Sequence, residues 1–156
     1  MTTNTAVTSN ENINASMPTK SYTLASVAAL IIGSAAYSIG LFNAQMALNE
    51  KGYYLIVLLY GLFSMISLQK TVRDEREGIK TSIMYTRLCW LSSAIAITLL
   101  TVGLYNAEML LSEKGFYAMA YTLSLFAVVV MQKNIRDSQL DETVLELDIN
   151  PSIEQE

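Results

Sequence analysis

The chain has 156 residues, of which 52% are hydrophobic and only 15% are charged, and its formal net charge is −4. It contains no histidine and a single cysteine, Cys89, which excludes a Cys/His metal site and an intrachain disulfide. The acidic balance arises from residues 137–156, which carry seven acidic side chains and no basic one, and no Lys/Arg cluster is dense enough for nucleic acid.

Residues 1–20 come first and form a polar tail rich in Thr, Asn and Ser, which we predict to be disordered. The tail lacks the basic start of a signal peptide, so we expect the apolar stretch after it to remain in the protein. Four uncharged, mainly apolar stretches follow: 21–49, 52–69, 88–107 and 115–132. A membrane span needs about 20 such residues, and lipid selects helices because every backbone amide must be satisfied locally. The sequence therefore predicts an all-α membrane protein with four transmembrane helices.

In chain order, the predicted elements form two membrane repeats separated by a charged connector. The first repeat, 21–74, has helices at 22–48 and 53–72, and the second, 83–137, has helices at 83–111 and 116–135. The connector is 75–82, with Gly78 as a helix stop, and an acidic C-terminal tail occupies 138–156.

The two repeats are copies of one another. Residues 40–74 and 103–137 align without a gap at an offset of 63, and 16 of the 35 aligned positions are identical. Such self-similarity indicates a duplicated structural unit, here two tandem helical hairpins.

The placement of Lys and Arg predicts the orientation of these hairpins. Eight basic residues lie before the first helix, around the connector and after the fourth helix, and only Lys51 and Lys114 lie in the turns. Since positively charged loops stay in the cytoplasm, we expect both termini and the connector inside and both turns outside. The two hairpins would then share one orientation and form a parallel repeat.

Small residues recur on one face of the first helix of each repeat. Their spacings keep them on a single helical face, and small residues allow membrane helices to approach closely. We therefore predict that these two helices pack against each other, or against copies in an oligomer. The predicted packing face comprises Ala29, Gly33, Gly40, Ala44, Ser92, Ala96, Gly103 and Ala107.

Asn43, Asn106 and Glu108 form a candidate intramembrane polar site near the outer ends of the same helices. One interpretation is a symmetric hydrogen-bonded bridge between the two asparagines, since polar side chains often bond across membrane helices. The other is the mouth of a polar pathway, with Glu108 as an intramembrane carboxylate. The counterpart of Glu108 in the first repeat is Gln45, which cannot titrate.

The outer turns repeat the pattern [Asn/Ser]-Glu-Lys-Gly-[Tyr/Phe]-Tyr. Asn or Ser can cap a helix, Gly permits a tight turn, and the aromatic residues suit the headgroup level. We interpret this motif as an interfacial hairpin anchor rather than a ligand site. Its residues are Glu50, Lys51, Gly52, Glu113, Lys114 and Gly115.

A second repeated motif, Gln-Lys-x-[Val/Ile]-Arg-Asp at 69–74 and 132–137, closes each repeat, and its cations are placed to reach the headgroups. The chain has no nucleophile with a partnered base and no phosphate-binding Gly loop. We therefore expect no enzymatic activity and no cofactor.

The pattern GL[F/Y]NA[Q/E]MxL[N/S]EKG[Y/F]Y, followed by QKx[V/I]RD, closely resembles the YiaA/YiaB family of bacterial inner membrane proteins. The resemblance covers about residues 22–137 and implies two YiaA/B two-helix domains, as in the longer, YiaA-type members. It also implies a multi-pass protein of the inner membrane, and it carries no known reaction or substrate.

Two functions agree with these features. The first is a non-enzymatic structural or accessory protein that acts by association, in the lipid bilayer, with its own copies or with another membrane protein. The second is a small oligomeric transporter or channel that uses Glu108 with Asn43 and Asn106.

Overall fold

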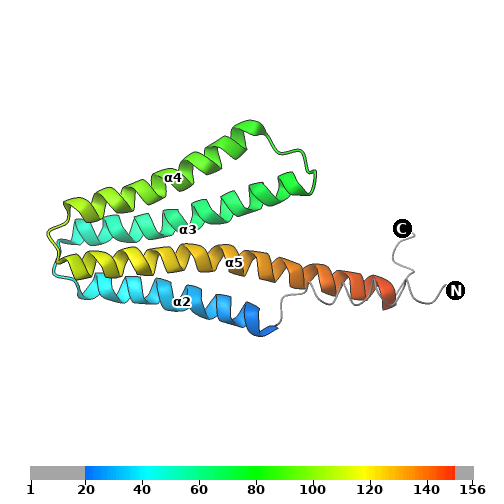
Figure 1. Ribbon diagram of the computed structural model, residues 1–156, viewed down its shortest axis with the longest axis horizontal. Coiled ribbons are helices and arrows are strands. Elements are labelled where there is room, and N and C mark those ends of the chain that lie inside the picture. The colour runs from blue at the N-terminus through cyan, green and yellow to red at the C-terminus, as the bar shows by residue number, and fades with distance from the viewer. Residues whose placement is uncertain (1–19, 150–156) are drawn as a thin grey trace.

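The computed structural model describes the backbone of residues 20–149 and the side chains of residues 21–135. Four helices run back and forth along one long axis: α2 (Lys20–Asn43), α3 (Leu48–Arg76), α4 (Ile83–Asn106) and α5 (Leu111–Ile149) (Figure 1). This part of the chain contains no strand, and the predicted all-α architecture of four long apolar helices is confirmed. The N-terminal tail predicted for residues 1–20 lies outside the described residues, apart from Lys20, as do residues 150–156.

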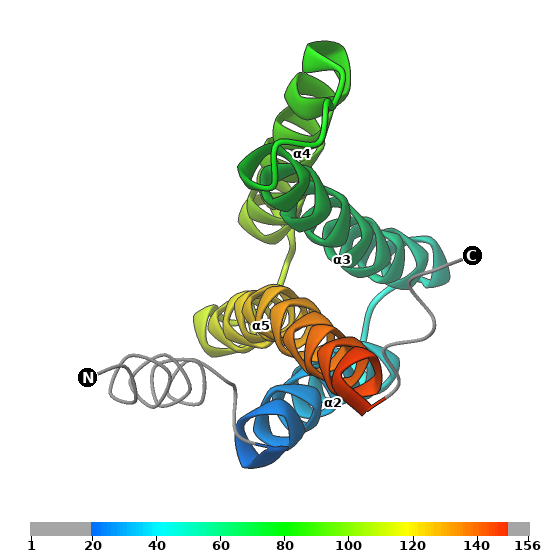
Figure 2. The same ribbon diagram turned by 90° about the vertical axis from the view of Figure 1, so that its right-hand side faces the viewer.

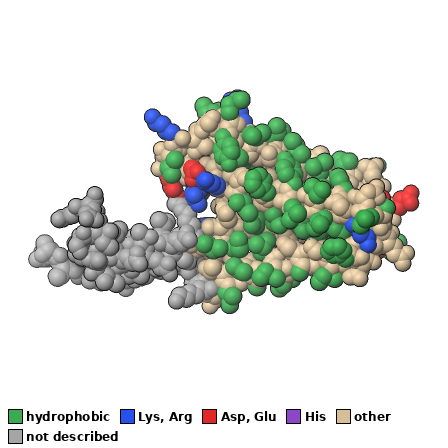
Figure 3. Space-filling view, turned by 180° about the vertical axis from the view of Figure 1, so that it is seen from behind, with side chains coloured by type: hydrophobic (Ala, Val, Ile, Leu, Met, Phe, Trp, Pro, Cys, Tyr) green, Lys and Arg blue, Asp and Glu red, His purple; other side chains and the backbone are tan. Residues whose placement is uncertain are grey.

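All four helices are long and apolar enough to cross a membrane, over Ser21–Asn43, Leu48–Arg76, Ile83–Asn106 and Leu111–Ile135. Only 22% to 39% of each apolar window is buried inside the protein. Large apolar side chains cover the outside of the bundle, and the charged side chains gather at its ends (Figure 3). A water-soluble monomer rarely exposes apolar patches of more than a few hundred Å², whereas lipid covers such a surface without cost.

The hairpin turns lie earlier in the chain than we predicted. They occupy residues 44–47 and 107–110, so the motif residues after them form the first turns of α3 and α5. Gly52 and Gly115 are helical rather than turn-forming, and nothing lies within 4 Å of the place where a Cβ would stand. We call this end of the bundle the turn end, and the end with residues 77–82 the connector end.

At the connector end, Gly78 stops α3 as predicted, with φ of 72°. Its N–H donates to the carbonyl of Glu75 at 3.2 Å, and the N–H of Ile79 donates to that of Asp74 at 2.9 Å. These two bonds form a Schellman motif, which satisfies the last carbonyls of the helix.

α5 does not end near Ile135, where we predicted the fourth membrane helix to finish. It continues to Ile149, so most of the predicted acidic tail is helical (Figure 1). The physical reason is composition, because residues 136–149 contain no Gly or Pro and several strong helix formers.

The helices pair across the two repeats. α2 packs along α5 and α4 packs along α3, while α3 and α5 meet in the centre. Viewed from the end, α4 and α3 form one layer and α2 and α5 the other (Figure 2). The two helices of one hairpin pack much less closely against each other than against helices of the other hairpin. The first helix of each repeat therefore has as its main partner the second helix of the other repeat.

This crossed pairing is repeated at the level of atoms. A Cβ at Gly40 would lie 2.7 Å from Cε1 of Phe116, and a Cβ at Gly103 would lie 2.7 Å from Cε1 of Tyr53. Both the two glycines and the two aromatic residues are related by the offset of 63. The contacts of one repeat thus recur in the other, as a two-fold axis between α3 and α5 requires.

The centre of the bundle is filled by aromatic and aliphatic side chains from all four helices. The rings of Tyr37 and Tyr117 meet edge to face with centroids 5.4 Å apart, and Tyr54 stacks on Tyr117 at 6.3 Å. Edge-to-face and offset-stacked rings are favoured arrangements in a close-packed interior. The core comprises Tyr37, Leu41, Tyr54, Val57, Leu58, Leu100, Leu104, Tyr117, Ala120, Tyr121 and Leu125.

Candidate functional site

The glutamate of each repeated turn motif caps the helix that follows it. Glu50 accepts a hydrogen bond from the N–H of Ala47 at 2.9 Å, and Glu113 accepts one from the N–H of Leu110 at 3.0 Å. Each glutamate is the third residue of its helix, so this is the glutamate half of a capping box. The carboxylate also lies at the positive end of the helix dipole, which favours its charge.

The lysine of the same motif forms a hydrogen bond with the end of the preceding helix. Lys51 donates to the carbonyl of Phe42 at 2.8 Å, and Lys114 donates to that of Tyr105 at 3.3 Å. Both carbonyls belong to the last turn of a helix, where they lack an intrahelical partner. Adjacent Glu and Lys side chains thus stabilise the two helix ends that meet at each turn.

Asn43 and Asn106 do not form the bridge that we predicted. Each amide donates to the carbonyl four residues earlier in its own helix, Asn43 to Ile39 and Asn106 to Val102, both at 2.8 Å. Both side chains are exposed, and α2 and α4 are not packed together. Each asparagine side chain therefore bonds within its own helix and not across the repeats.

Glu108 lies outside the helix in which we placed it. α4 ends at Asn106, so Glu108 is an exposed residue of the second turn rather than an intramembrane carboxylate. The misplacement has the same cause as the shifted turns, because the helix was extended to Leu111.

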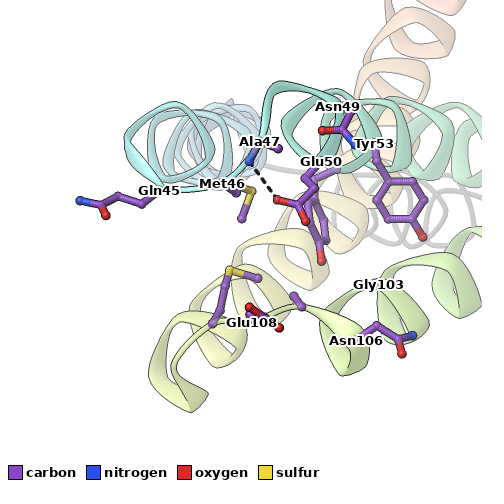
Figure 4. A pocket seen from close by; sticks show the side chains of 12 residues that line it. Gln45, Met46, Ala47, Asn49, Glu50, Tyr53, Gly103, Asn106 and Glu108 are labelled. Carbon is purple, nitrogen blue, oxygen red and sulfur yellow. Dashed lines mark hydrogen bonds between the residues drawn. The ribbon is translucent and has the colours of Figure 1, made fainter.

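A cavity of about 820 Å³ lies between the two turns, and Asn106 and Glu108 are among its lining residues, although the side chains of Gln45 and Asn106 point away from the space between the turns (Figure 4). Asn106 and Glu108 contribute to its wall from the second repeat, and Gln45 and Glu50 from the first. Asn43 is not among the lining residues. The remaining walls are formed by Met46, Ala47, Asn49, Tyr53, Tyr54, Gly103, Ala107 and Met109.

The charged residues that line the cavity are acidic. Glu50 is engaged in its helix cap, and both Glu50 and Glu108 are exposed. Within the described residues, no group of three or more His, Cys, Asp or Glu side chains is placed to hold a metal ion. Of its two carboxylates, Glu50 is therefore committed to a helix cap, and Glu108 belongs to the second turn.

The small-residue face contacts partners other than those we predicted. Gly33 faces α5, where a Cβ would lie 2.7 Å from Oγ of Ser124 and 3.3 Å from the carbonyl oxygen of Ala120. Gly40 also faces α5, and Gly103 faces α3. Ala96 is 1% exposed, and Ala29, Ala44, Ser92 and Ala107 are half-buried. The first helices of the two repeats therefore use their small faces against the second helices, and not against each other.

Two buried polar contacts near the connector end escaped the sequence analysis. Asn134 donates to the hydroxyl of Ser26 at 3.2 Å, and Thr71 donates to the sulfur of Cys89 at 3.4 Å. The offset of 63 relates Ser26 to Cys89 and Thr71 to Asn134. A comparison of the repeats restricted to polar residues would have singled out these four positions.

Further along the bundle, hydroxyl groups bond between the two helices of one repeat. Tyr37 donates to the carbonyl of Tyr54 at 3.1 Å, and Tyr121 donates to that of Ala96 at 3.3 Å. Each bond satisfies a buried donor, which would cost free energy if it were left unpaired in a membrane.

The comparison with known proteins finds the same two repeats. The model of the yiaA/B two helix domain matches residues 22–74 and, a second time, residues 85–137. The chain belongs to the yiaA/B two-helix-domain family. Over 120 residues it is 53% identical to inner membrane protein YiaA of Escherichia coli, which covers 77% of this chain and 83% of the relative.

Two further relatives of the yiaA/B member described here are more distant. Inner membrane protein YiaB of E. coli is 32% identical over 96 residues, covering 62% of this chain and 81% of YiaB. The uncharacterized membrane protein YubF of Bacillus subtilis is 38% identical over 60 residues, covering 38% of this chain and 69% of YubF. No solved structure matches the chain. With inner membrane relatives and four apolar helices, this yiaA/B protein is a multi-pass protein of the inner membrane.

Proposed function

We propose that this yiaA/B protein is a non-enzymatic accessory component of the inner membrane that acts by binding a transmembrane helix of another membrane protein. The observation that carries the proposal is an apolar groove of about 510 Å³ on the flank of the bundle between α4 and α5. It lies in the middle of the apolar windows, at the depth of the hydrocarbon. Its walls are Met65, Ile97, Leu100, Thr101, Leu104, Ala118, Tyr121, Thr122, Leu125, Phe126 and Val129.

The chemistry of the groove suits the side chains of a helix. The hydroxyls of Thr101 and Thr122 already donate to carbonyls of their own helices, at 2.9 Å and 2.8 Å. The groove therefore presents methyl groups rather than free donors, and Ala118 leaves room for close approach. Membrane helices associate largely by such van der Waals packing, because lipid supplies no hydrophobic driving force.

The use of polar groups inside the bundle supports a non-catalytic role. The buried hydroxyl, amide and thiol groups described above are engaged in contacts between helices, either across the two repeats or within one repeat. A general acid or base needs a reactive group within reach of a substrate, and these groups are committed to packing.

We also propose that both termini and the connector lie in the cytoplasm and both turns on the opposite side. The support is the excess of Lys and Arg at the connector end, together with the engagement of Lys51 and Lys114 in turn contacts. The test is labelling with a membrane-impermeant thiol reagent in a Cys89→Ala background. Ser112→Cys should react when the reagent is added to intact cells, and Thr81→Cys should react only after permeabilisation. The opposite pattern would invert the assignment.

The partner experiment uses a matched pair of tryptophan variants. Thr101→Trp fills the groove, whereas Ser38→Trp introduces the same bulk at the corresponding position of the first repeat. We expect Thr101→Trp to reduce co-purification of the partner at least fivefold after mild extraction, and Ser38→Trp to retain it. The composition of the complex is measured by native mass spectrometry at natural expression level.

Extraction of the wild-type protein alone, or as a complex of identical copies only, would contradict the accessory role. The transporter alternative has weaker support, because Glu108 lies in an exposed turn. One and two helical turns before it on α4, Leu104 and Leu100 are 8% and 6% exposed and belong to the packed core.

A further inference from the structure

The second repeated motif converges on a cavity that the proposed function does not use. A cavity of about 230 Å³ opens at the connector end between α3 and α5, which diverge slightly toward this end (Figure 1). Gln69 and Gln132, the first residues of the two motif copies, both line it. They meet because α3 and α5 pack against one another about the two-fold axis.

The charge of the cavity wall is positive. Arg73 and Arg76 from α3 and Lys133 from α5 contribute three cations, and Glu77 is the one carboxylate in the wall. Asp74 lies outside the lining and pairs with Nη2 of Arg73 at 3.3 Å. Arg73 also forms a salt bridge with Glu77 at 3.9 Å, so the wall keeps an excess of cations, three against these two carboxylates.

These cations are not needed to cap helices. Backbone N–H groups of Glu77, Gly78 and Ile79 already satisfy the last carbonyls of α3. α5 continues as a helix to Ile149, so Lys133 lies beside an uninterrupted helix and not beside a helix end. A capping role, which is the usual use of basic residues at helix C-termini, is thus already filled.

One donor in the cavity wall lacks a hydrogen bond. Nε of Arg73 is buried and has no hydrogen-bond partner among the described residues, although it forms a salt bridge with the carboxylate of Glu77 at 3.9 Å. A guanidinium carries five N–H donors in a fixed fork that matches phosphate oxygens. The two glutamine amides can add further donors.

We propose that this cavity binds a phosphate group at the membrane surface, and that its source is the headgroup of an anionic phospholipid. The cavity lies where the apolar spans of α3 and α5 end, which is the level of the headgroups. Basic pockets between membrane helices at this level suit anionic headgroups. The phosphate oxygens accept from Arg73, Arg76 and Lys133, and the acyl chains extend along the apolar helix surfaces.

The test uses the full chain in detergent, with retained lipid counted by native mass spectrometry. The probes are phosphatidylglycerol, the zwitterionic phosphatidylcholine, and inorganic phosphate alone. The wild type should retain phosphatidylglycerol in preference to phosphatidylcholine. The double variant Arg76→Gln/Lys133→Gln should weaken that binding by roughly 10- to 30-fold, since each of the two basic residues contributes about equally to the electrostatic attraction for an anionic lipid.

Two controls distinguish a site from general charge or misfolding. Lys70 is the counterpart of Lys133 at the offset of 63, is exposed and does not line the cavity, so Lys70→Gln should change binding less than twofold. Glu77→Gln removes the carboxylate from the wall and should strengthen binding, which a damaged fold would not do.

Equal retention of the two lipids by the wild type, or equal loss in Lys70→Gln and the double variant, would overturn the proposal. Competition by millimolar inorganic phosphate would support a phosphate site and assign the source to a soluble ligand instead of a lipid. Lipid binding that phosphate does not displace supports the headgroup.

Discussion

At the residue scale, the repeated Glu-Lys pair acts on helix ends. Each glutamate caps the helix that it begins, and each lysine reaches back to the helix before it. The two helices of a hairpin pack loosely against each other. These bonds therefore fix the conformation of the turn, which helix packing alone would define less well. The acceptor oxygen matters for this role more than the negative charge.

That distinction gives the first prediction. Glu113→Ala should lower the free energy of unfolding by about 1 kcal/mol, the typical cost of a lost N-terminal cap. Glu113→Gln should retain most of the stability, because glutamine also accepts at this position of a capping box. Unfolding in mixed micelles, followed by circular dichroism, measures both. Equal losses in the two variants would mean that the carboxylate charge itself is required.

A pair of glycines gives the second prediction. Gly33→Ala presses a methyl group onto Ser124 and the backbone of α5 and should destabilise the protein by about 1–3 kcal/mol, a typical cost of overpacking. Gly52 is also helical but has open space around it, so Gly52→Ala should be neutral or stabilising by up to about 1 kcal/mol. The same denaturation assay compares them. Similar destabilisation by both substitutions would remove close packing as the explanation.

Residue patterns predicted the hairpins but placed their turns several residues late. Glycine in the Glu-Lys-Gly motif was taken as the turn former, although it lies inside a helix. The capping-box signature expects Ser or Thr three residues before the glutamate, and here Ala47 and Leu110 occupy that position. The backbone N–H of the capping residue still bonds to the glutamate, so half of the motif works without its usual sequence signal.

At the scale of the helices, the sequence predicted which face would pack but not against which partner. A stripe of small residues accepts any neighbour that fits, and the pattern alone does not distinguish α4 from α5 as the partner of α2. The deciding feature is complementarity, since Phe116 and Tyr117 of α5 fit over Gly40. Their counterparts, Tyr53 and Tyr54, do the same over Gly103.

Disulfide crosslinking tests the crossed pairing directly. The hydroxyl oxygens of Ser34 and Ser124 lie 3.5 Å apart between α2 and α5. In a Cys89→Ser background with a protease site in the connector, Ser34→Cys/Ser124→Cys should oxidise and keep the two halves together on a non-reducing gel.

The matched control pair is Ala29→Cys/Ser92→Cys, which would face each other only if α2 packed against α4. We expect no crosslink within the chain from this pair. Efficient crosslinking of the control, with none between positions 34 and 124, would contradict the crossed arrangement.

At the scale of the whole molecule, the two hairpins are not independent units. Most of the buried surface of each helix is supplied by the other repeat, so neither hairpin contains its own core. We therefore expect the pair of two-helix domains, and not the single domain, to be the unit of folding.

The fourth prediction follows from that dependence. Fragments 1–78 and 79–156, expressed together, should co-purify as a one-to-one complex, because the connector contributes no packing that the halves cannot make. Fragment 1–78 expressed alone should be degraded or should self-associate. Size-exclusion chromatography with mass measurement distinguishes these states. A stable monomer of either half would show that the hairpins fold separately.

The crossed pairing also has a consequence for ancestry. A forerunner with one hairpin could bury its glycine face only against the second helix of another copy, so it had to work as a two-fold dimer. Tandem duplication and fusion would turn that association of two chains into packing within one chain. The effective concentration of the two halves would then be set by the short connector. Once fused, the two halves were free to diverge, and Ser26 opposite Asn134 and Cys89 opposite Thr71 record that divergence at a single ancestral contact.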